Sequence, residues 1–133
     1  MKIRQDFITN SSSSSYIIAW RPTETPTEKE DFVNNMIDNI LGVSSGETRC
    51  AYAYHTREDL LVLAENYYYD SIEELLECED EKLAGQFRIM LECIDNGCTV
   101  YNKWIDNRDY ITPYILKILL EESQNAVIIK YGD

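Results

Sequence analysis

The chain has 133 residues, of which 44% are apolar and 27% are charged, and its net charge at pH 7 is −12. This length and apolar share are those of one folded domain and argue against global disorder. The negative charge disfavours direct nucleic-acid binding by the body of the chain, because such a surface repels phosphate backbones. The charge suits a protein partner with a basic surface, or it serves only to keep the protein in solution.

The N-terminal residues differ from the rest of the chain in composition. Lys2 and Arg4 are basic, but the apolar segment of a secretory signal does not follow them. No apolar run in the chain approaches the roughly 18 residues that cross a bilayer. We therefore expect a cytoplasmic protein with no membrane association. Residues 11–15 are all serine and are predicted to form a loop, because serine competes with regular structure by bonding to nearby backbone.

The first strand and the first helix are predicted directly after the serines. Residues 16–20 (YIIAW) have the short apolar pattern of a buried strand. Thr25, with Glu28 three residues later, matches a capping box at the start of a helix. Gly42 is a natural end for that helix. Its predicted buried face consists of apolar residues at helical spacing: Phe32, Met36, Ile37, Ile40 and Leu41.

The middle of the chain predicts a second strand and two further helices. Residues 49–54 alternate in the manner of a strand. Thr56 and Asp59 have the spacing of a helix cap, and apolar residues follow them. Ser71 and Glu74 form another capping box, which predicts the start of a short third helix.

The last part of the chain predicts a helix, a strand, a helix and a strand. The long helix runs from about Glu79 to Asn96, and the strand after it covers residues 98–105. Thr112 is predicted to cap the next helix, because Pro113 is tolerated only near a helix start. Residues 126–131 (AVIIKY) are predicted to form an inner strand, since they are apolar on both faces.

The order of these elements predicts the fold. The last strand, helix and strand fit a right-handed crossover that makes strands 98–105 and 126–131 parallel. We therefore expect an α+β (α/β-like) fold, with one mixed sheet of about four strands covered by about five helices. Residues 1–15 are expected to form a basic, Ser-rich N-terminal segment, and residues 16–133 are expected to form a single acidic domain.

The sequence lacks the common nucleotide-binding motifs and the zinc-protease motif. GxGxxG, GxxxxGK[ST] and HExxH are missing, and the four cysteines form no CxxC pair. We expect no catalytic residue, no cofactor and no metal. Cys50 and His55 would lie on opposite faces of a continuous strand, which disfavours a Cys–His enzyme. An acidic run lacks the ligand spacing of a calcium loop and is interpreted as a charged helix start: Glu77, Glu79, Asp80 and Glu81.

Three consecutive tyrosines end the second predicted helix, and they cannot all be buried. Tyrosine is favoured at protein interfaces, because its ring is rigid and its hydroxyl bonds readily. Two interpretations stay open: a partner-binding surface, or one ring packed inward with two rings lying over the surface. The candidate partner-binding residues are Glu65, Tyr67, Tyr68, Tyr69 and Asp70.

The N-terminal stretch MKIRQDFITNSSSSSYI has the form MKIRxxF(V/I)xNSSSSS(F/Y)I, and it covers about an eighth of the chain. It resembles an N-terminal sequence of assorted short proteins of Firmicutes and their phages. The resemblance implies a shared N-terminal purpose and transfers no catalytic residue. Three interpretations stay open: a tag read as an extended peptide, an anion-binding nest, or a solvated loop. The residues concerned are Phe7, Asn10, Ser11, Ser12, Ser13, Ser14 and Ser15.

These observations favour a small non-enzymatic protein-binding module with an acidic, Tyr-rich face. The resemblance implies an origin in a phage or mobile element, and we expect an inhibitor of a host nucleic-acid-handling protein, such as an anti-CRISPR-like protein. Two alternatives stay open: a phage structural or cargo protein recognised through its N-terminal tag, and a small enzyme with a site near His55. The partner's identity, any ligand and the oligomeric state are left open.

Overall fold

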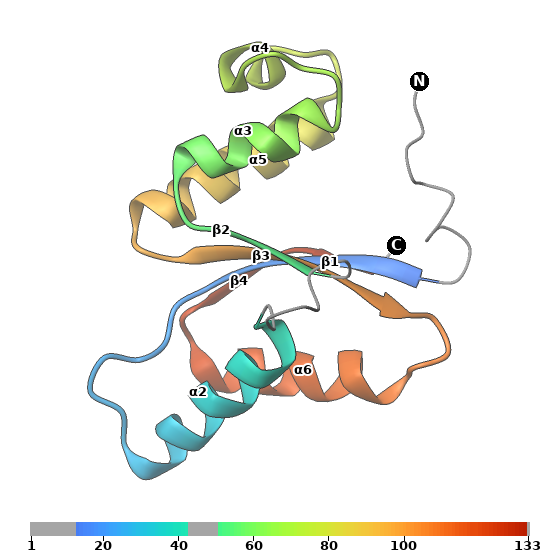
Figure 1. Ribbon diagram of the computed structural model, residues 1–133. Coiled ribbons are helices and arrows are strands. Elements are labelled where there is room, and N and C mark those ends of the chain that lie inside the picture. Colours follow the sequence, from blue (N-terminus) through green and yellow to red (C-terminus); the bar gives the residue numbers. More distant parts are fainter. Residues whose placement is uncertain (1–12, 43–50, 133) are drawn as a thin grey trace.

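The computed structural model describes residues 13–42 and 51–132, and it shows one four-stranded sheet with helices on both faces (Figure 1). The predicted α+β class, with four strands and five helices in the described ranges, is confirmed. The strands are β1 (Ser13–Trp20), β2 (Ala51–Tyr54), β3 (Thr99–Asp106) and β4 (Ala126–Tyr131). The helices are α2 (Glu28–Leu41), α3 (Arg57–Glu65), α4 (Ile72–Leu76), α5 (Glu81–Asp95) and α6 (Ile111–Ser123).

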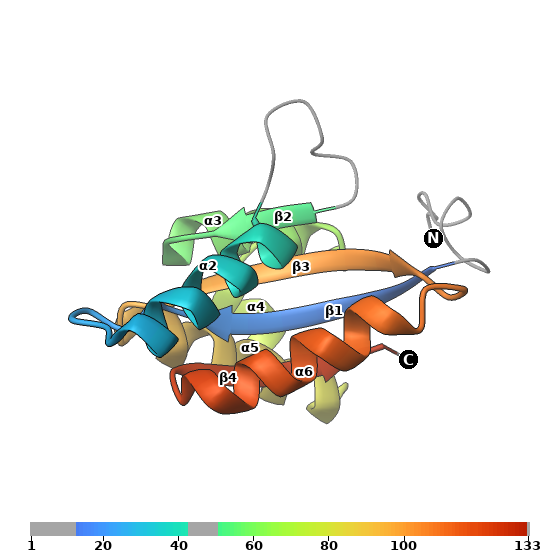
Figure 2. The same ribbon diagram turned by 90° about the horizontal axis from the view of Figure 1, so that it is seen from below.

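The sheet lies between two layers of helices, each with its own core. Helices α3, α4 and α5 cover one face, and α2 and α6 cover the other (Figure 1 and Figure 2). Successive residues of a strand point to opposite faces. In β1, Ile17 and Ala19 therefore join the core under α3, α4 and α5, whereas Ile18 and Trp20 join the core under α2 and α6. Burial on both faces explains why this part of β1 is apolar at every position.

The pairing of the strands differs from the prediction. The strand order is β2-β3-β1-β4, and every neighbouring pair is antiparallel, so the expected mixed sheet is wrong. Strands β3 and β4 do run in the same direction, but β1 lies between them. In this central place the last four residues of β1 are buried on both faces. In this order β4 is an edge strand, and not the inner strand that its apolar sequence predicted.

Serines 13–15 begin β1, so the loop predicted for them is wrong. The Ser14 hydroxyl donates to Asn107 Oδ1 at 2.6 Å, and the Ser15 hydroxyl accepts from Lys130 Nζ at 3.0 Å. These hydroxyls bond to side chains from distant parts of the chain, and the neighbouring strand satisfies the backbone. The expected domain boundary after residue 15 therefore falls inside a strand.

Helix α2 begins later than predicted. Thr27 Oγ1 accepts from the Glu30 backbone N–H at 3.2 Å, and the Glu30 carboxylate accepts from the Thr27 N–H at 3.0 Å. The segment TETPTEKE contains the capping pattern twice, and the structure uses the second copy rather than the one at Thr25. Phe32, predicted to be buried, is 62% exposed. The buried residues of α2 are Val33, Asn34, Ile37 and Leu41.

Helix α6 has Tyr110 at its N-cap rather than the predicted Thr112, and the side chain that bonds to its first N–H groups comes from the preceding residue, Asp109. The Asp109 carboxylate accepts from the backbone N–H groups of Ile111, at 3.1 Å, and Thr112, at 2.9 Å. Thr112 is therefore inside the helix rather than at its cap. Pro113 still placed the helix start to within one residue, because the first N–H groups of a helix have no intrahelical partner.

Candidate functional site

The three tyrosines lie directly after α3, where the chain turns toward α4 (Figure 1). The Tyr68 N–H bonds to the Glu65 carbonyl at 3.0 Å, and the Tyr69 N–H bonds to the Ala64 carbonyl at 3.2 Å. These two bonds are those of a Schellman motif, which has one residue in the left-handed region. That residue is Tyr68, with φ of 70°. Glycine is the usual residue there, because a Cβ is strained in this conformation.

The motif gives the three rings different environments. Tyr69 is half-buried and packs against the core under α3, α4 and α5. Tyr67 is 42% exposed and meets the Phe87 ring edge-on, with 6.3 Å between centroids, whereas Tyr68 is 56% exposed. One ring thus packs inward and two lie at the surface, as one of the two interpretations expected. The two exposed rings keep the binding hypothesis open.

Tyr69 is anchored through its hydroxyl as well as its ring. A hydrogen bond with the Cys78 side chain raises the pKa of Tyr69, and burial and the negative charges of Asp80 and Glu74 raise it further. The Tyr69 ring packs inward rather than lying at the surface.

Carboxylates are concentrated in the segment of the chain that contains these rings. Residues 65–81 carry eight of the chain's 24 acidic side chains and no basic one. All eight are exposed. We call these carboxylates and the two exposed rings, Tyr67 and Tyr68, the acidic tyrosine surface. Its acidic residues are Glu65, Asp70, Glu73, Glu74, Glu77, Glu79, Asp80 and Glu81.

Hydrogen bonds hold the backbone of this surface in place. Ser71 Oγ accepts from the Glu74 N–H at 3.1 Å, which confirms the predicted cap, and the Glu74 carboxylate accepts from the Asp70 N–H at 3.1 Å. At the other end of α4, the Arg88 guanidinium donates to the Leu76 carbonyl at 2.9 Å. A surface that is already ordered loses less conformational entropy when it binds a partner.

The acidic run before α5 has the structural role that the sequence indicated. Asp80 Oδ1 accepts from the Leu83 N–H at 3.1 Å and caps α5, and Glu81 lies in the first turn. In residues 13–42 and 51–132, no group of three or more His, Cys, Asp or Glu side chains is placed to hold a metal ion. Cys78 and Cys98 are half-buried free thiols, and Cys93 is a buried one.

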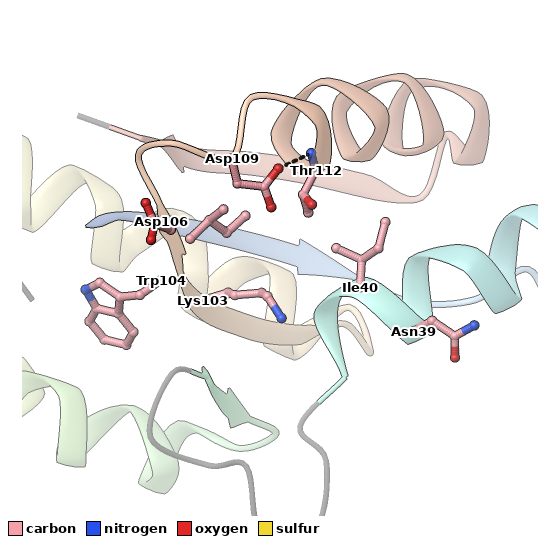
Figure 3. A pocket seen from close by; sticks show the side chains of 8 residues that line it. Asn39, Ile40, Lys103, Trp104, Asp106, Asp109 and Thr112 are labelled. Carbon is pink, nitrogen blue, oxygen red and sulfur yellow. Dashed lines mark hydrogen bonds between the residues drawn. The ribbon is translucent and has the colours of Figure 1, made fainter. Parts of the chain in front are cut away.

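A pocket of about 300 Å³ opens at the end of β3, between α2 and the start of α6 (Figure 3). Both of its carboxylates are engaged, because Asp109 caps α6 and Asp106 forms an ion pair with Arg108 at 2.8 Å. The hydrogen bond from Arg108 lowers the pKa of Asp106 to about 2, and the bonds from Thr112 lower that of Asp109. Neither carboxylate is suited to proton transfer near pH 7. The lining residues are Asn39, Ile40, Lys103, Trp104, Ile105, Asp106, Asp109 and Thr112.

His55, the centre of the enzyme alternative, lines neither this pocket nor a second pocket of about 480 Å³ beside the connection from β1 to α2. Its ring is exposed, and Nδ1 lies 3.2 Å from Thr99 Oγ1. Its backbone N–H donates to Asp59, the residue that completes the capping box of α3 with Thr56. Cys50, its possible partner, lies outside the described residues. The described surroundings of His55 therefore support a structural role at the start of α3.

The N-terminal candidates fall partly within the described residues. Ser13, Ser14 and Ser15 belong to β1, and Ser14 is only 6% exposed. Inside the sheet, these three serines are not available as a separate extended peptide. The tag hypothesis therefore concerns residues that lie outside the described part of the chain: Phe7, Asn10, Ser11 and Ser12.

The structure also shows an exposed apolar stripe that sequence reasoning missed. Helix α6 buries Leu116, Leu119 and Leu120, yet five further large apolar side chains at its start and along it are exposed. The sequence did carry a signal, because the segment ITPYILKILL has more apolar residues than one helix face buries. We call this set the α6 stripe: Tyr110, Ile111, Tyr114, Ile115 and Ile118.

Comparisons with known proteins do not extend this picture. No protein-family model matches the chain, and the searches of curated proteins and of solved structures found no match. In the part of the chain that the structure describes, no helix has the length and apolar character needed to cross a membrane. The candidate site therefore rests on its own geometry, and the N-terminal resemblance stays a prediction.

Proposed function

We propose that this protein is a non-enzymatic protein-binding module that docks through the acidic tyrosine surface. The observation that carries the proposal is Tyr68, which holds a left-handed backbone position where glycine is free of strain and is nevertheless 56% exposed. Backbone strain that is retained at an exposed side chain is typical of sites with a role besides folding. The turn itself would be less strained with glycine, so we infer that the tyrosine is present for its ring.

The chemistry of the surface favours a basic partner. Arginine and lysine side chains bond to carboxylates and also stack against tyrosine rings. Exposed tyrosines supply contact area at a low entropic cost and are enriched among the residues that dominate binding energy. Clustered carboxylates increase the rate of association with a basic surface and make the rate sensitive to salt.

The concrete form that we propose is an inhibitor encoded by a phage or mobile element, which acts in the host cytoplasm on a protein that handles nucleic acid. Such a protein has a basic groove for phosphate backbones, often with room for stacked bases. The acidic tyrosine surface offers negative charges together with flat rings. A nucleic acid presents the same combination to such a groove, as phosphates and bases. The origin of the protein rests on the N-terminal resemblance alone.

Affinity capture from a Firmicutes lysate tests this proposal. Three versions of the full chain are immobilised: wild type, the double variant Tyr67→Ser/Tyr68→Ser, and the control Phe32→Ser, which removes an exposed ring from the opposite layer of helices. We expect a nucleic-acid-binding protein to be retained at low salt by wild type and by the control. The double variant should lose it, and high salt or added nucleic acid should release it.

Two results would contradict the proposal. One is that wild type retains no protein at low salt. The other is that the double variant retains the same protein as strongly as wild type does. Circular dichroism of each variant checks that the chain is folded, so that a loss of capture reports on the surface and not on unfolding.

A further inference from the structure

Strand β4 lies at one edge of the sheet, and its outer side is open. It pairs with β1, and no other described strand pairs with it. Alternate residues of an edge strand direct their N–H and C=O groups away from the sheet, where they are ready to pair with another strand. Val127 and Ile128, which point to opposite faces of the sheet, are 41% and 39% exposed.

Strand β4 has only some of the features that usually protect an edge strand. It contains no proline, and its one charged residue, Lys130, is turned toward the neighbouring strand, where Nζ donates to Ser15 Oγ at 3.0 Å. A register shift opposite Ile17 and Ile18 is the one irregularity in its pairing with β1. An apolar edge of this kind favours pairing with a further strand.

Helix α6 packs against β4 beside this edge. The Tyr131 hydroxyl donates to the Pro113 carbonyl, and Lys117 Nζ lies 5.7 Å from the centroid of the Tyr131 ring. These contacts join α6 to β4, and Figure 2 shows the helix lying over the strand. Tyr110 and Tyr114 are each one helical turn from Pro113 and Lys117, so the tyrosines of the α6 stripe adjoin the strand edge.

The charge of this surface indicates what covers it. Residues 110–131 contain two basic and two acidic side chains, so their net charge is zero, and the rest of the chain carries the whole −12. A strongly basic partner gains little attraction here. Two copies of an acidic chain, in contrast, repel one another least where the local charge cancels. The four charged residues are Lys117, Glu121, Glu122 and Lys130.

We propose that this surface joins two copies of the chain into a dimer, in which β4 pairs antiparallel with β4 of the second copy across a two-fold axis. Self-pairing of one strand about a two-fold axis is antiparallel and closes the assembly at two copies. The two sheets then form one continuous eight-stranded sheet, with the two α6 helices on the same face. Lys117 and Glu121, one turn apart on α6, have the opposite signs that reciprocal ion pairs across the axis require.

The α6 stripe is needed for such a dimer. A stable interface buries roughly 800 Å² on each partner. A strand of six residues is only about 20 Å long, so its edge alone is too small. The stripe adds two tyrosines and three isoleucines, whose burial supplies most of the apolar area. This inference is independent of the proposed function, because the acidic tyrosine surface lies on the other layer of helices.

Light scattering and analytical ultracentrifugation of the full chain over a wide concentration range test the dimer. Val127→Lys places a cation on the open edge of β4, and Val62→Lys is the matched control, because Val62 is 57% exposed on α3. We expect wild type and the control to have twice the mass of the chain at high concentration. Val127→Lys should raise the dissociation constant at least about tenfold. Ile118→Lys, on the α6 stripe, should do the same.

Several results would overturn the dimer. They are a wild-type chain that is monomeric at every concentration, an assembly larger than two copies, and a Val127→Lys variant that dimerises as strongly as wild type. Hydrogen exchange distinguishes pairing through β4 from a dimer that is joined only through α6, because only strand pairing protects the outward-pointing amides of β4. We expect the outward-pointing amides of β4 to exchange more slowly in the wild-type dimer than in monomeric Val127→Lys, and equal rates would contradict strand pairing.

Discussion

Among the residues that the structure describes, Tyr68 and Gln124 are the two other than glycine that hold left-handed backbone positions, at the ends of α3 and α6, with φ of 70° and 63°. A Cβ in this conformation costs roughly 1–2 kcal/mol, and glycine removes the strain but adds freedom to the unfolded chain. We expect Tyr68→Gly and Gln124→Gly each to raise the free energy of unfolding by up to about 1 kcal/mol. Urea denaturation, with an unchanged dependence on urea concentration, measures this.

The two glycine variants should differ in binding. Gln124→Gly lies away from the acidic tyrosine surface and should bind the partner as wild type does. Tyr68→Gly should lose binding while it gains stability. A Tyr68→Gly chain that is less stable than wild type would show that the ring is kept for packing, and it would remove the argument for a binding role.

Tyr54 should make the stability of the folded chain fall at alkaline pH. Burial raises the pKa of Tyr54 to about 12, and the side chain is only 5% exposed. In the unfolded chain a tyrosine releases its proton near its ordinary pKa of about 10, so between these values the folded state binds more protons. The free energy of unfolding should therefore fall as pH rises from about 10 to about 12, by about 1.4 kcal/mol per pH unit from this residue.

Urea denaturation of wild type and Tyr54→Phe across this pH range checks that expectation. The variant should be less stable than wild type near pH 8, because it loses the hydroxyl beside Asn102, and its stability should fall less steeply as pH rises. The remaining slope comes partly from Tyr131, whose pKa burial also raises to about 12. Equal slopes in the two proteins would contradict the assignment to Tyr54.

The individual residues of the candidate site were only partly predictable from the sequence. Three consecutive tyrosines at a helix end cannot share one buried face, which is why the sequence singled them out. Which ring turns inward depends on the Schellman motif and on the contact of Tyr69 with the core. Both arise from tertiary packing, which a local sequence pattern does not report.

Most helices and strands lie where their local sequence patterns predicted them. The N-cap of α2 is a case in which the sequence offers two candidates. Two threonines two residues apart, Thr25 and Thr27, both match the capping pattern before α2, and the structure uses Thr27. We expect Thr27→Ala to lower the free energy of unfolding by about 1 kcal/mol, because it removes the bond from the Glu30 N–H. Thr25→Ala should change it by less than about 0.5 kcal/mol. Thermal or urea unfolding of the two variants separates the two caps, and equal losses would contradict the assignment.

The position of β4 shows what local patterns leave out. Its residues were predicted correctly as a strand, but its apolar sequence was interpreted as that of an inner strand. The same pattern serves an edge strand here, because Ile129 packs against one core while Ala126 and Tyr131 pack against the other. Serines 13–15 are the converse case, because hydroxyl bonds to Asn107 and Lys130 allow a polar run inside a sheet. In both places a distant partner decides the structure.

The molecule has two kinds of surface, which lie on different layers of helices. The acidic tyrosine surface carries eight carboxylates on the layer formed by α3, α4 and α5, whereas residues 110–131 have no net charge and include the exposed α6 stripe. Charge repels other copies from the first surface and permits contact through the second. A dimer joined at β4 would carry two acidic tyrosine surfaces in one particle, which raises avidity wherever a target offers two basic sites within reach.

Hydrogen exchange of the full chain, alone and bound to its captured partner, tests the central claim most directly. We expect slower exchange on binding in residues 65–77, from the end of α3 through α4. We expect no change in α6 or around His55. Protection that appears beside His55 or along α6, with residues 65–77 unaffected, would contradict the assignment of the acidic tyrosine surface as the docking site.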